Sequence, residues 1–381
     1  MNIALSFPGC HRRGGVERIV YECARYLSGR GHDVTVFASE FESEIESTIQ
    51  YHHVPVPLRP SFLVGPRYYR RCSGILNRNG FGVLNTHGVV CPLWGVHWVQ
   101  SVHSAWIDRS REYRPPWSMA RFKQWLNPLH SMILKLEEEH FGKRQYRKII
   151  ATTPEVQKDL EHYYGVPPED VVLIPNGFAP DEFNPERRAA RRQAERKKLN
   201  LKPNDVAILL VANELERKGY RTILSALQIL NSPRLRLIVI GRPNVDKVRR
   251  QARDVGLANC VLACGSTNDV ARFHAVADIF VLPTQYEAFC LAILEALGSG
   301  LPVVTTRIPG ADNAIQPGVN GLLINDPQSG GELAEALRTL LDDSTRAAFS
   351  TRAPRTVAHY QWPVVLKQYE NVLCGYDYRC A

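Results

Sequence analysis

Short apolar runs alternate with amphipathic segments along most of this chain. In the first half, apolar runs predict strands at residues 3–7, 33–38, 83–86, 98–102, 148–152 and 171–174. Between the first two runs, apolar residues recur at the spacing of one helix face, at Val16, Ile19, Val20, Cys23, Ala24 and Leu27. Gly29 and Gly31 mark the end of this helix. Residues 115–147 are predicted to be largely helical.

The same rhythm restarts after a polar, proline-bearing stretch that follows Pro175–Phe178. Apolar runs predict further strands at residues 206–211, 235–240, 260–263, 279–282 and 303–305, with helical segments between them. Nearly continuous apolar strands that alternate with helices are typical of parallel sheets covered on both faces. Because 381 residues exceed one typical core, we expect two α/β domains.

Composition places the chain among globular proteins, with 44% apolar and 22% charged residues. It contains no run of eighteen apolar residues, so we expect no membrane span. The segment Met1–Phe7 has no basic region and leads into a strand, so no signal peptide is predicted. Nine cysteines without framework spacing favour reduced thiols. We therefore expect a cytoplasmic protein.

The net charge of +9 predicts an acidic partner, namely anionic lipid, nucleic acid or a phosphorylated substrate. No recognisable nucleic-acid module is present, so nucleic acid is not the expected partner. The basic run at residues 187–198 is interpreted as a solvated helix face.

Other basic residues gather with aromatic ones in the first half of the chain. The basic members are Arg67, Arg70, Arg71, Arg121, Lys123, Arg144, Arg147 and Lys148, and the aromatic ones are Tyr68, Tyr69, Trp106, Trp117, Phe122 and Trp125. This mixture suits the surface of an anionic membrane. Packing of exposed loops explains it nearly as well.

Two carboxylates, Glu287 and Glu295, flank the junction between an apolar strand and the helix that follows it. The pattern places Glu287 in the loop and Glu295 in the helix. Carboxylates there accept hydroxyls of a sugar, while the helix N-terminus faces an anion. The alternative is that both residues solvate one helix face, although eight residues of helix would separate their directions by about 80°.

The loop Asn213–Gly219 follows the first strand of the second half and carries Arg217 and Lys218. Fixed cations at this place stabilise the charge on a departing diphosphate. Since cations at a helix N-terminus oppose the helix dipole, a functional role is favoured over simple solvation. Gly14 and Gly15 lie between the first strand and helix, where glycine lets backbone N–H groups approach a phosphate. A plain tight turn explains these two glycines equally well.

The Glu287–Glu295 segment, with its sequel Gly300-Leu-Pro-Val-Val304, resembles the paired-glutamate motif of retaining GT-B glycosyltransferases in the glycosyl transferases group 1 family. Gly14–Arg18 resembles the Gly-Gly-x-(Glu/Gln)-Arg opening of that family. Asn213 stands where many members have arginine, a variant that resembles the lipopolysaccharide-core glucosyltransferase branch.

The resemblance implies an α/β GT-B fold with two Rossmann-like, doubly wound, parallel-sheet domains and the active site in the cleft between them. Residues 1–178, joined by a crossover helix at 360–381, would form the acceptor-binding domain. Residues 200–358 would form the domain that binds the nucleotide sugar.

The resemblance also assigns roles to individual residues. It implies catalytic roles for Glu287 and for His103, whose segment Val102-His-Ser104 is expected to end a strand near the reacting carbons. His87, in Asn85–Gly88, resembles a second histidine site of the family. The implied donor contacts are Gly14, Gly15, Arg217, Lys218, Gly265, Ala288, Phe289, Cys290, Leu291 and Glu295. Ala288 and Cys290 replace glycines that the family often has, which leaves the sugar open.

The implied activity is transfer of a hexose, with retained configuration, from a nucleoside-diphosphate sugar to a glycan or lipid-linked glycan acceptor. We prefer a UDP-linked donor and a role in the synthesis of cell-envelope polysaccharide or lipopolysaccharide. Arg217, Lys218 and a helix terminus would meet the phosphate charge, so no metal or other cofactor is expected. A cytoplasmic location, at the inner face of the membrane if the basic and aromatic cluster binds lipid, fits this role.

Several alternatives stay open at this stage. Attack from the front face within an ion pair and double displacement through Glu287 both retain configuration. A GT-B nucleotide-sugar epimerase needs no acceptor. A non-catalytic assembly protein that binds nucleotide sugars would keep the donor site without turnover.

Overall fold

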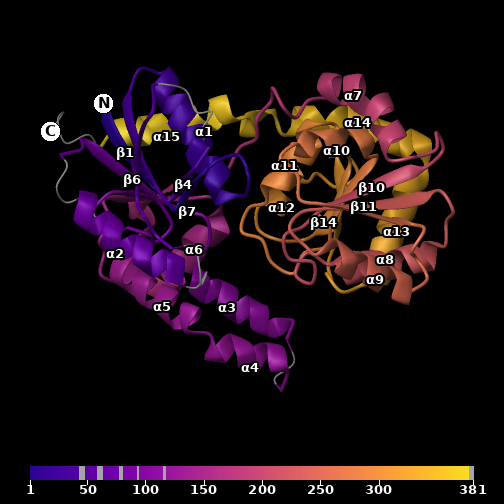
Figure 1. Cartoon of the computed structure of the whole chain (residues 1–381), viewed down its shortest axis with the longest axis horizontal. Coiled ribbons are helices and arrows are strands. Elements are labelled where there is room, and N and C mark those ends of the chain that lie inside the picture. Colours follow the sequence, from indigo (N-terminus) through magenta and orange to yellow (C-terminus); the bar gives the residue numbers. More distant parts are fainter. Residues whose placement is uncertain (43–47, 58–62, 77–79, 92–93, 115–116, 377–381) are drawn as a thin grey trace. The chain divides into compact units, whose positions relative to one another are not determined.

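The computed structural model describes residues 1–42, 48–57, 63–76, 80–91, 94–114 and 117–376. The chain folds into two units, Met1–Asn176 with Trp362–Ala381, and Gly177–Gln361 (Figure 1). Each unit contains its own parallel sheet, which confirms the prediction of two doubly wound α/β domains. Residues 179–199, which the sequence pattern left between the predicted domains, belong to the second unit.

The first unit is built on a seven-stranded sheet in which neighbouring strands are parallel. Its strands, in sheet order, are β5 (Gln50–His53), β3 (Asp33–Ala38), β1 (Asn2–Ser6), β6 (Val83–His87), β7 (Val96–Val99), β8 (Lys148–Ala151) and β9 (Val171–Leu173). Its α-helices are α1 (Val16–Gly29), α2 (Val64–Leu76), α3 (His103–Glu112), α4 (Met119–Leu126), α5 (Pro128–Glu137), α6 (Pro154–Tyr164) and α15 (Trp362–Cys374). A π-helix (Glu138–Gly142), a 3₁₀-helix (Pro168–Asp170) and the short strands β2 (Gly9–Cys10) and β4 (Glu40–Phe41) complete it.

Two differences from the sequence pattern matter in this unit. The strand predicted at residues 98–102 lies at Val96–Val99, and a helix begins at His103. The edge strand β5 was missed because its residues are polar and mostly exposed, so it lacks the apolar signal of a buried strand.

The second unit is built on a six-stranded parallel sheet. Its strands, in sheet order, are β12 (Val261–Gly265), β11 (Leu235–Ile240), β10 (Val206–Val211), β13 (Ile279–Leu282), β14 (Val303–Thr306) and β15 (Gly321–Ile324). Its α-helices are α7 (Pro185–Lys198), α8 (Tyr220–Leu230), α9 (Val245–Asp254), α10 (Val270–Val276), α11 (Leu291–Gly298), α12 (Ala311–Ala314), α13 (Gly330–Leu341) and α14 (Asp343–Thr356). A 3₁₀-helix (Ala358–Tyr360) precedes the return of the chain to the first unit.

The basic helix α7 is solvated on one face only: Arg187, Lys197 and Lys198 are exposed, but other arginines of residues 187–198 face the interior of the unit. Arg188 and Arg192 donate hydrogen bonds to the carbonyl oxygen of Ala277, just beyond α10. The buried Arg196 donates to the Val276 carbonyl oxygen and forms an ion pair with Asp278. These guanidinium groups satisfy carbonyls that the end of α10 leaves without helical partners.

Each sheet has one point where the strand order reverses, so that successive strands are added on one side of it and then on the other. In the first sheet β1 lies between β3 and β6, and in the second β10 lies between β11 and β13. Loops that leave two such neighbouring strands diverge to opposite faces and open a crevice at the carboxyl edge, where ligands of doubly wound sheets bind. The loops after β10 and β13 are therefore the place to search for a ligand site in the second unit.

The core of the first unit contains a stack of aromatic rings that joins its sheet to α15. The ring of Trp98 packs against Tyr369, with centroids 5.0 Å apart, and against His87 at 5.6 Å. The Tyr369 hydroxyl donates to Oδ1 of Asn85 at 3.0 Å, and both residues are fully buried.

Among the residues that the structure describes, no helix is both long and apolar enough to cross a membrane.

Replacing Tyr369 by Phe is expected to lower the free energy of unfolding of the first unit by about 1–3 kcal/mol, because Oδ1 of Asn85 would stay buried without its donor. Tryptophan fluorescence during urea unfolding reports on this unit, since the six tryptophans of the chain all belong to it. Tyr163→Phe, which removes a hydroxyl bonded to the exposed Asp108, is the matched control and should cost less than about 0.5 kcal/mol. Equal losses in both variants would contradict the prediction.

His87 should make the first unit less stable in acid. Burial lowers the pKa of His87 from its usual 6.5 to about 3. The unfolded chain therefore binds a proton at His87 below pH 6.5 that the native chain does not, and the free energy of unfolding falls as the pH drops. Between pH 7 and pH 5, His87→Phe should reduce this fall by about 2 kcal/mol. An unchanged pH dependence in urea titrations of the variant would refute this assignment.

Candidate functional site

The loops that follow β10 and β13 lie against each other at the carboxyl edge of the second sheet. The backbone N–H of Gln285 donates to the Arg217 carbonyl oxygen at 2.9 Å, and the Thr284 hydroxyl donates to the same oxygen at 3.2 Å. Gly219 has a φ of +74°, and a Cβ there would lie 2.1 Å from the Pro283 carbonyl oxygen. Glycine is therefore required for this close approach of the two loops.

Three charged side chains converge where these loops meet. Nη1 of Arg217 donates to Oε1 of Glu287 at 2.7 Å and to the Tyr286 carbonyl oxygen at 2.6 Å. Nζ of Lys218 forms an ion pair with the same carboxylate oxygen. The Glu287 side chain is 15% exposed and that of Lys218 11%. Two cations thus share one largely buried carboxylate, and Arg217 also pairs with the exposed Glu214.

The pKa values show that these charges support one another. Burial by itself raises the pKa of Glu287, but Lys218 and Arg217 outweigh it and hold the pKa below its usual value. Burial likewise opposes the charge on Lys218, yet the neighbouring Cys290 and Glu287 raise its pKa. All three groups are therefore ionised at neutral pH, and the two cations are the groups that attract an anionic ligand.

The segment after Glu287 leads directly into α11. Sγ of Cys290 lies 3.9 Å from Nζ of Lys218, and burial raises the pKa of the Cys290 thiol. Ala288 and Cys290 are buried, whereas Phe289 and Leu291 are half-buried. Glu287 lies in the loop and Glu295 lies in α11 with its side chain buried, as the sequence pattern predicted.

The neighbouring loop after β11 adjoins this site from the other side of β10. Oδ1 of Asn213 accepts a hydrogen bond from the backbone N–H of Arg242 at 3.2 Å. Gly241 has a φ of +132°, and a Cβ there would lie 1.8 Å from the Ala212 carbonyl oxygen. Asn213 therefore ties two loops together. Gly265 ends β12 with a φ of +72°, and its carbonyl oxygen accepts a hydrogen bond from Gly241.

Gly14, Gly15 and the two predicted histidines belong to the first unit. Gly15 directly precedes α1, and its carbonyl oxygen accepts the N–H of Ile19. Gly14 has a φ of +117°, and a Cβ there would lie 2.4 Å from Oε2 of Glu17. His87 ends β6, and the two glycines lie in the loop after β1. These two strands are neighbours at the point where the strand order of the first sheet reverses.

His103 does not end a strand, and that prediction was wrong: it is the first residue of α3. The buried Glu137 accepts the backbone N–H groups of His103 at 2.6 Å and of Ser104 at 3.2 Å, so it caps the helix. The ring of His103 stacks on Trp106, and its Nε2 lies 2.9 Å from Nδ1 of His130. Burial, with a smaller effect of His130, lowers the pKa of His103 to about 4, so the imidazole is neutral at pH 7.

Sequence reasoning missed His130 and Glu137 as partners of His103. They lie 27 and 34 residues further along the chain, and no short motif connects them. They meet because α3 and α5 pack against each other.

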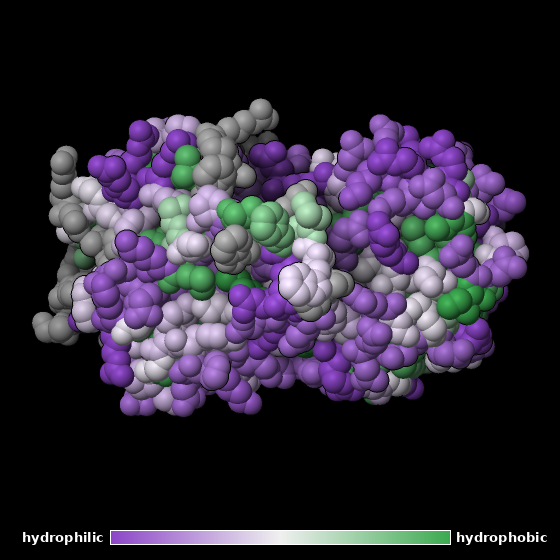
Figure 2. Space-filling view, turned by 90° about the horizontal axis from the view of Figure 1, so that it is seen from below, coloured by the Kyte–Doolittle hydropathy of each residue, from purple (hydrophilic) through white to green (hydrophobic). Residues whose placement is uncertain are grey.

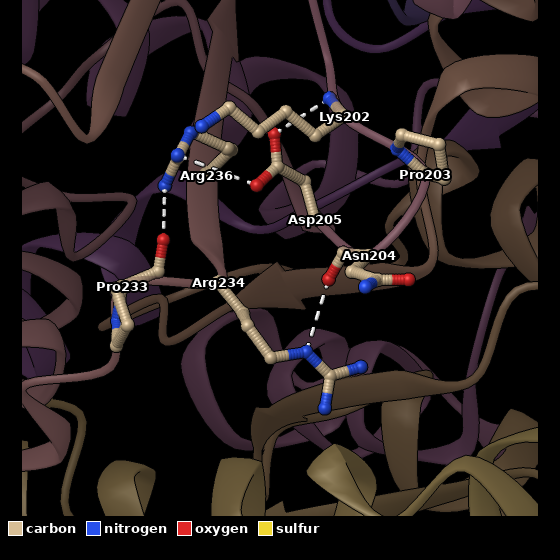
Figure 3. Close-up of a pocket in the computed structure, with 7 residues that line it drawn as sticks. All are labelled: Lys202, Pro203, Asn204, Asp205, Pro233, Arg234 and Arg236. Carbon is tan, nitrogen blue, oxygen red and sulfur yellow. Dashed lines mark hydrogen bonds and ion pairs between the residues drawn. The ribbon is translucent and has the colours of Figure 1, made fainter.

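An open pocket of about 360 Å³ lies at the amino ends of β10 and β11, away from the charged cluster (Figure 3). It is lined by Lys202, Pro203, Asn204, Asp205, Pro233, Arg234 and Arg236. Arg236 forms an ion pair with Asp205 at 3.3 Å, and Nε of Arg234 donates to the Asn204 carbonyl oxygen at 3.0 Å. Because its lining groups bind one another, this pocket is not our candidate site.

Sequence comparison with known families gives two matches. Residues 191–356 match the profile of the glycosyl transferases group 1 family, and residues 13–182 match that of Glycosyltransferase Family 4. The chain is 26% identical to the lipopolysaccharide glucosyltransferase WaaG of Escherichia coli (strain K12), with 87% of each chain covered. It is 27% identical to a D-inositol 3-phosphate glycosyltransferase of Thermobispora bispora, with 94% of this chain and 89% of that one covered.

Solved structures show the same fold. The crystal structure of WaaG superimposes with a TM-score of 0.82 at 23% identity, over 98% of this chain and 100% of that one. Anabaena HepE in complex with UDP-glucose superimposes with a TM-score of 0.74 at 18% identity, over 98% and 99% of the two chains. The chain therefore carries a glycosyl transferases group 1 domain at residues 191–356 and a Glycosyltransferase Family 4 domain at residues 13–182, and it has the GT-B fold.

Proposed function

We propose that this glycosyltransferase moves a hexose from a UDP-linked donor to a glycan or lipid-linked glycan acceptor, with retention of configuration. The observation that carries the proposal is the cluster of Arg217, Lys218 and Glu287 at the point in the second sheet where the strand order reverses. A UDP-linked donor is supported by the similarity to Anabaena HepE, whose structures contain UDP and UDP-glucose. An envelope glycan is supported by the similarity to the lipopolysaccharide glucosyltransferase WaaG.

The two cations suit the leaving group of this reaction. The diphosphate gains negative charge as the glycosyl bond breaks, and Arg217 and Lys218 are held in a largely buried place where such charge is stabilised strongly. We propose that they do so without a metal or other cofactor. Backbone N–H groups of Phe289, Cys290 and Leu291 would add contacts to the phosphates or the sugar.

Glu287 would accept hydrogen bonds from hydroxyl groups of the transferred sugar. Glu295 would accept them from hydroxyl groups of the ribose. The carboxylate of Glu287 is paired with two cations, which lowers its pKa and makes it a weak nucleophile. This pairing favours attack from the front face, with the departing phosphate taking the acceptor proton, over double displacement through Glu287. The neutral imidazole of His103 would position a sugar hydroxyl rather than supply a positive charge.

Helix α4 offers a surface for a membrane-bound acceptor. Apolar side chains of Trp117, Met119, Phe122 and Leu126 are exposed, Trp117 by 99%. Figure 2 looks onto the face that carries α4 and shows apolar side chains gathered there among hydrophilic ones. Basic residues of this region supply attraction to anionic headgroups. The side chains of Lys123 and Trp125, which contributed to the sequence-based prediction, lie outside those described.

The identity of the donor can be tested by measuring which nucleotide sugar raises the melting temperature of the purified protein. Among UDP-, GDP- and ADP-linked hexoses, UDP-glucose is expected to raise the melting temperature and to be turned over slowly. At one hundred times its Kd the gain is about 2.7 kcal/mol. Lys218→Ala should remove the stabilisation because it removes a cation of the phosphate site. Lys247→Ala, which changes an exposed lysine outside the cluster, is the control.

Transfer itself should depend on Glu287. Glu287→Gln is expected to lower kcat at least a hundredfold, because the uncharged amide accepts hydrogen bonds from sugar hydroxyls more weakly than the carboxylate and no longer balances the two cations. Transfer to acceptor glycans is measured by the amount of UDP that is released. Near-normal turnover in this variant would disprove the assigned role, and donor binding without turnover in the intact protein would favour a non-catalytic assembly protein.

Binding to membranes should depend on α4. The intact protein is expected to float with liposomes that contain anionic lipid at low salt and to dissociate as salt rises. The double variant Trp117→Ser/Phe122→Ser should reduce flotation at least fivefold, because it removes the exposed apolar groups that enter the interface. Leu173→Ser/Ile229→Ser changes exposed apolar residues elsewhere and should float normally. Equal flotation of both double variants would contradict a role for α4.

A further inference from the structure

Glu287 occupies the cations that a diphosphate would use. In this structure each nitrogen of the Arg217 guanidinium already has a partner: Nη1 donates to Glu287 and to the Tyr286 carbonyl oxygen, while Nε and Nη2 donate to Glu214. Nζ of Lys218 is bonded to Glu287 and lies near Sγ of Cys290. An incoming diphosphate must therefore displace a carboxylate before it binds either cation fully.

The two carboxylates differ in how readily they leave. Glu214 contacts Arg217 at 3.3 and 3.4 Å, and its side chain is 64% exposed, so water replaces these bonds at little cost. The Glu287 side chain is 15% exposed and shares one oxygen between Arg217 and Lys218. A largely buried carboxylate that loses both cations is strongly destabilised unless other donors replace them.

The backbone keeps Glu287 close to the cations. The loop that carries it is bonded to the Arg217 carbonyl oxygen through Thr284 and Gln285, and the Pro283 backbone packs directly on Gly219. Glu287 can therefore rotate away from the cations but cannot travel out into water with its loop unless these contacts break.

We propose that Glu287 makes the site distinguish an intact sugar nucleotide from the spent nucleoside diphosphate. This inference rests on the proposed function and deepens it. When a sugar accompanies the diphosphate, its hydroxyl groups donate to the displaced carboxylate and replace the lost cations. When the diphosphate comes alone, the carboxylate has no such replacement and competes for Arg217 and Lys218. Glu287 thereby weakens the binding of the product and assists its release.

The test compares three probes that share the phosphate chemistry: inorganic pyrophosphate, UDP and UDP-glucose. Their Kd values are measured by titration calorimetry on the full chain and on its Glu287→Gln variant. The variant is expected to bind pyrophosphate and UDP about tenfold more tightly than the intact protein, because the internal competitor is gone. It should bind UDP-glucose more weakly, so that the preference for UDP-glucose over UDP falls at least tenfold.

Two further variants make the test specific. Glu214→Gln introduces the same change beside Arg217 at an exposed position and should leave all three Kd values within about twofold. Glu287→Ala removes the carboxylate without adding an amide and should reproduce the tighter binding of pyrophosphate. Cooperative thermal melting of each variant establishes that it is folded.

The outcomes separate this inference from the function on which it rests. If the intact protein binds UDP-glucose but folded Glu287 variants bind pyrophosphate and UDP no more tightly than it does, the inference is overturned and the proposed function stands. If the intact protein binds neither these probes nor GDP- and ADP-linked hexoses, both are overturned together.

Discussion

The shared oxygen of Glu287, held by Arg217 and Lys218, is the interaction on which the candidate site depends. Each of these ions would cost several kcal/mol to bury alone, so the site is stable only if the two loops keep them in contact. The approach of Gly219 to Pro283 fixes that geometry in the backbone. The same arrangement accounts for the lowered pKa of Glu287 and is the basis of its proposed competition with a diphosphate.

The order of strands explains why this contact forms. Arg217 and Glu287 are 70 residues apart, but β10 and β13 are neighbours in the sheet. The loops that follow these strands therefore meet at the carboxyl edge of the sheet, where Gln285 and Thr284 bond to the Arg217 carbonyl oxygen. In the first unit, β1 and β6 are neighbours in the same way; Gly14 and Gly15 lie in the loop after β1, and His87 ends β6.

The positive charge of the chain serves different purposes in different places. The arginines of α7 satisfy carbonyl groups beyond α10 and pair with Asp278, so they contribute to folding. Arg217 and Lys218 pair with Glu287 at the carboxyl edge of the second sheet, where we propose the phosphate site. A net charge of +9 therefore indicated an anionic partner without telling which cations face it.

The sequence by itself determined the two α/β units, the central buried strands, and the placement of Glu287 in a loop and Glu295 in a helix, because these follow from local apolar periodicity and from a specific motif. It did not reveal the polar edge strand β5, whose residues carry no burial signal. Only the tertiary structure decided that Glu287 binds Arg217 and Lys218, that His103 starts a helix and contacts His130, and that α7 is partly buried. These contacts join residues far apart in the chain, so they depend on strand order and helix packing, which no local pattern encodes.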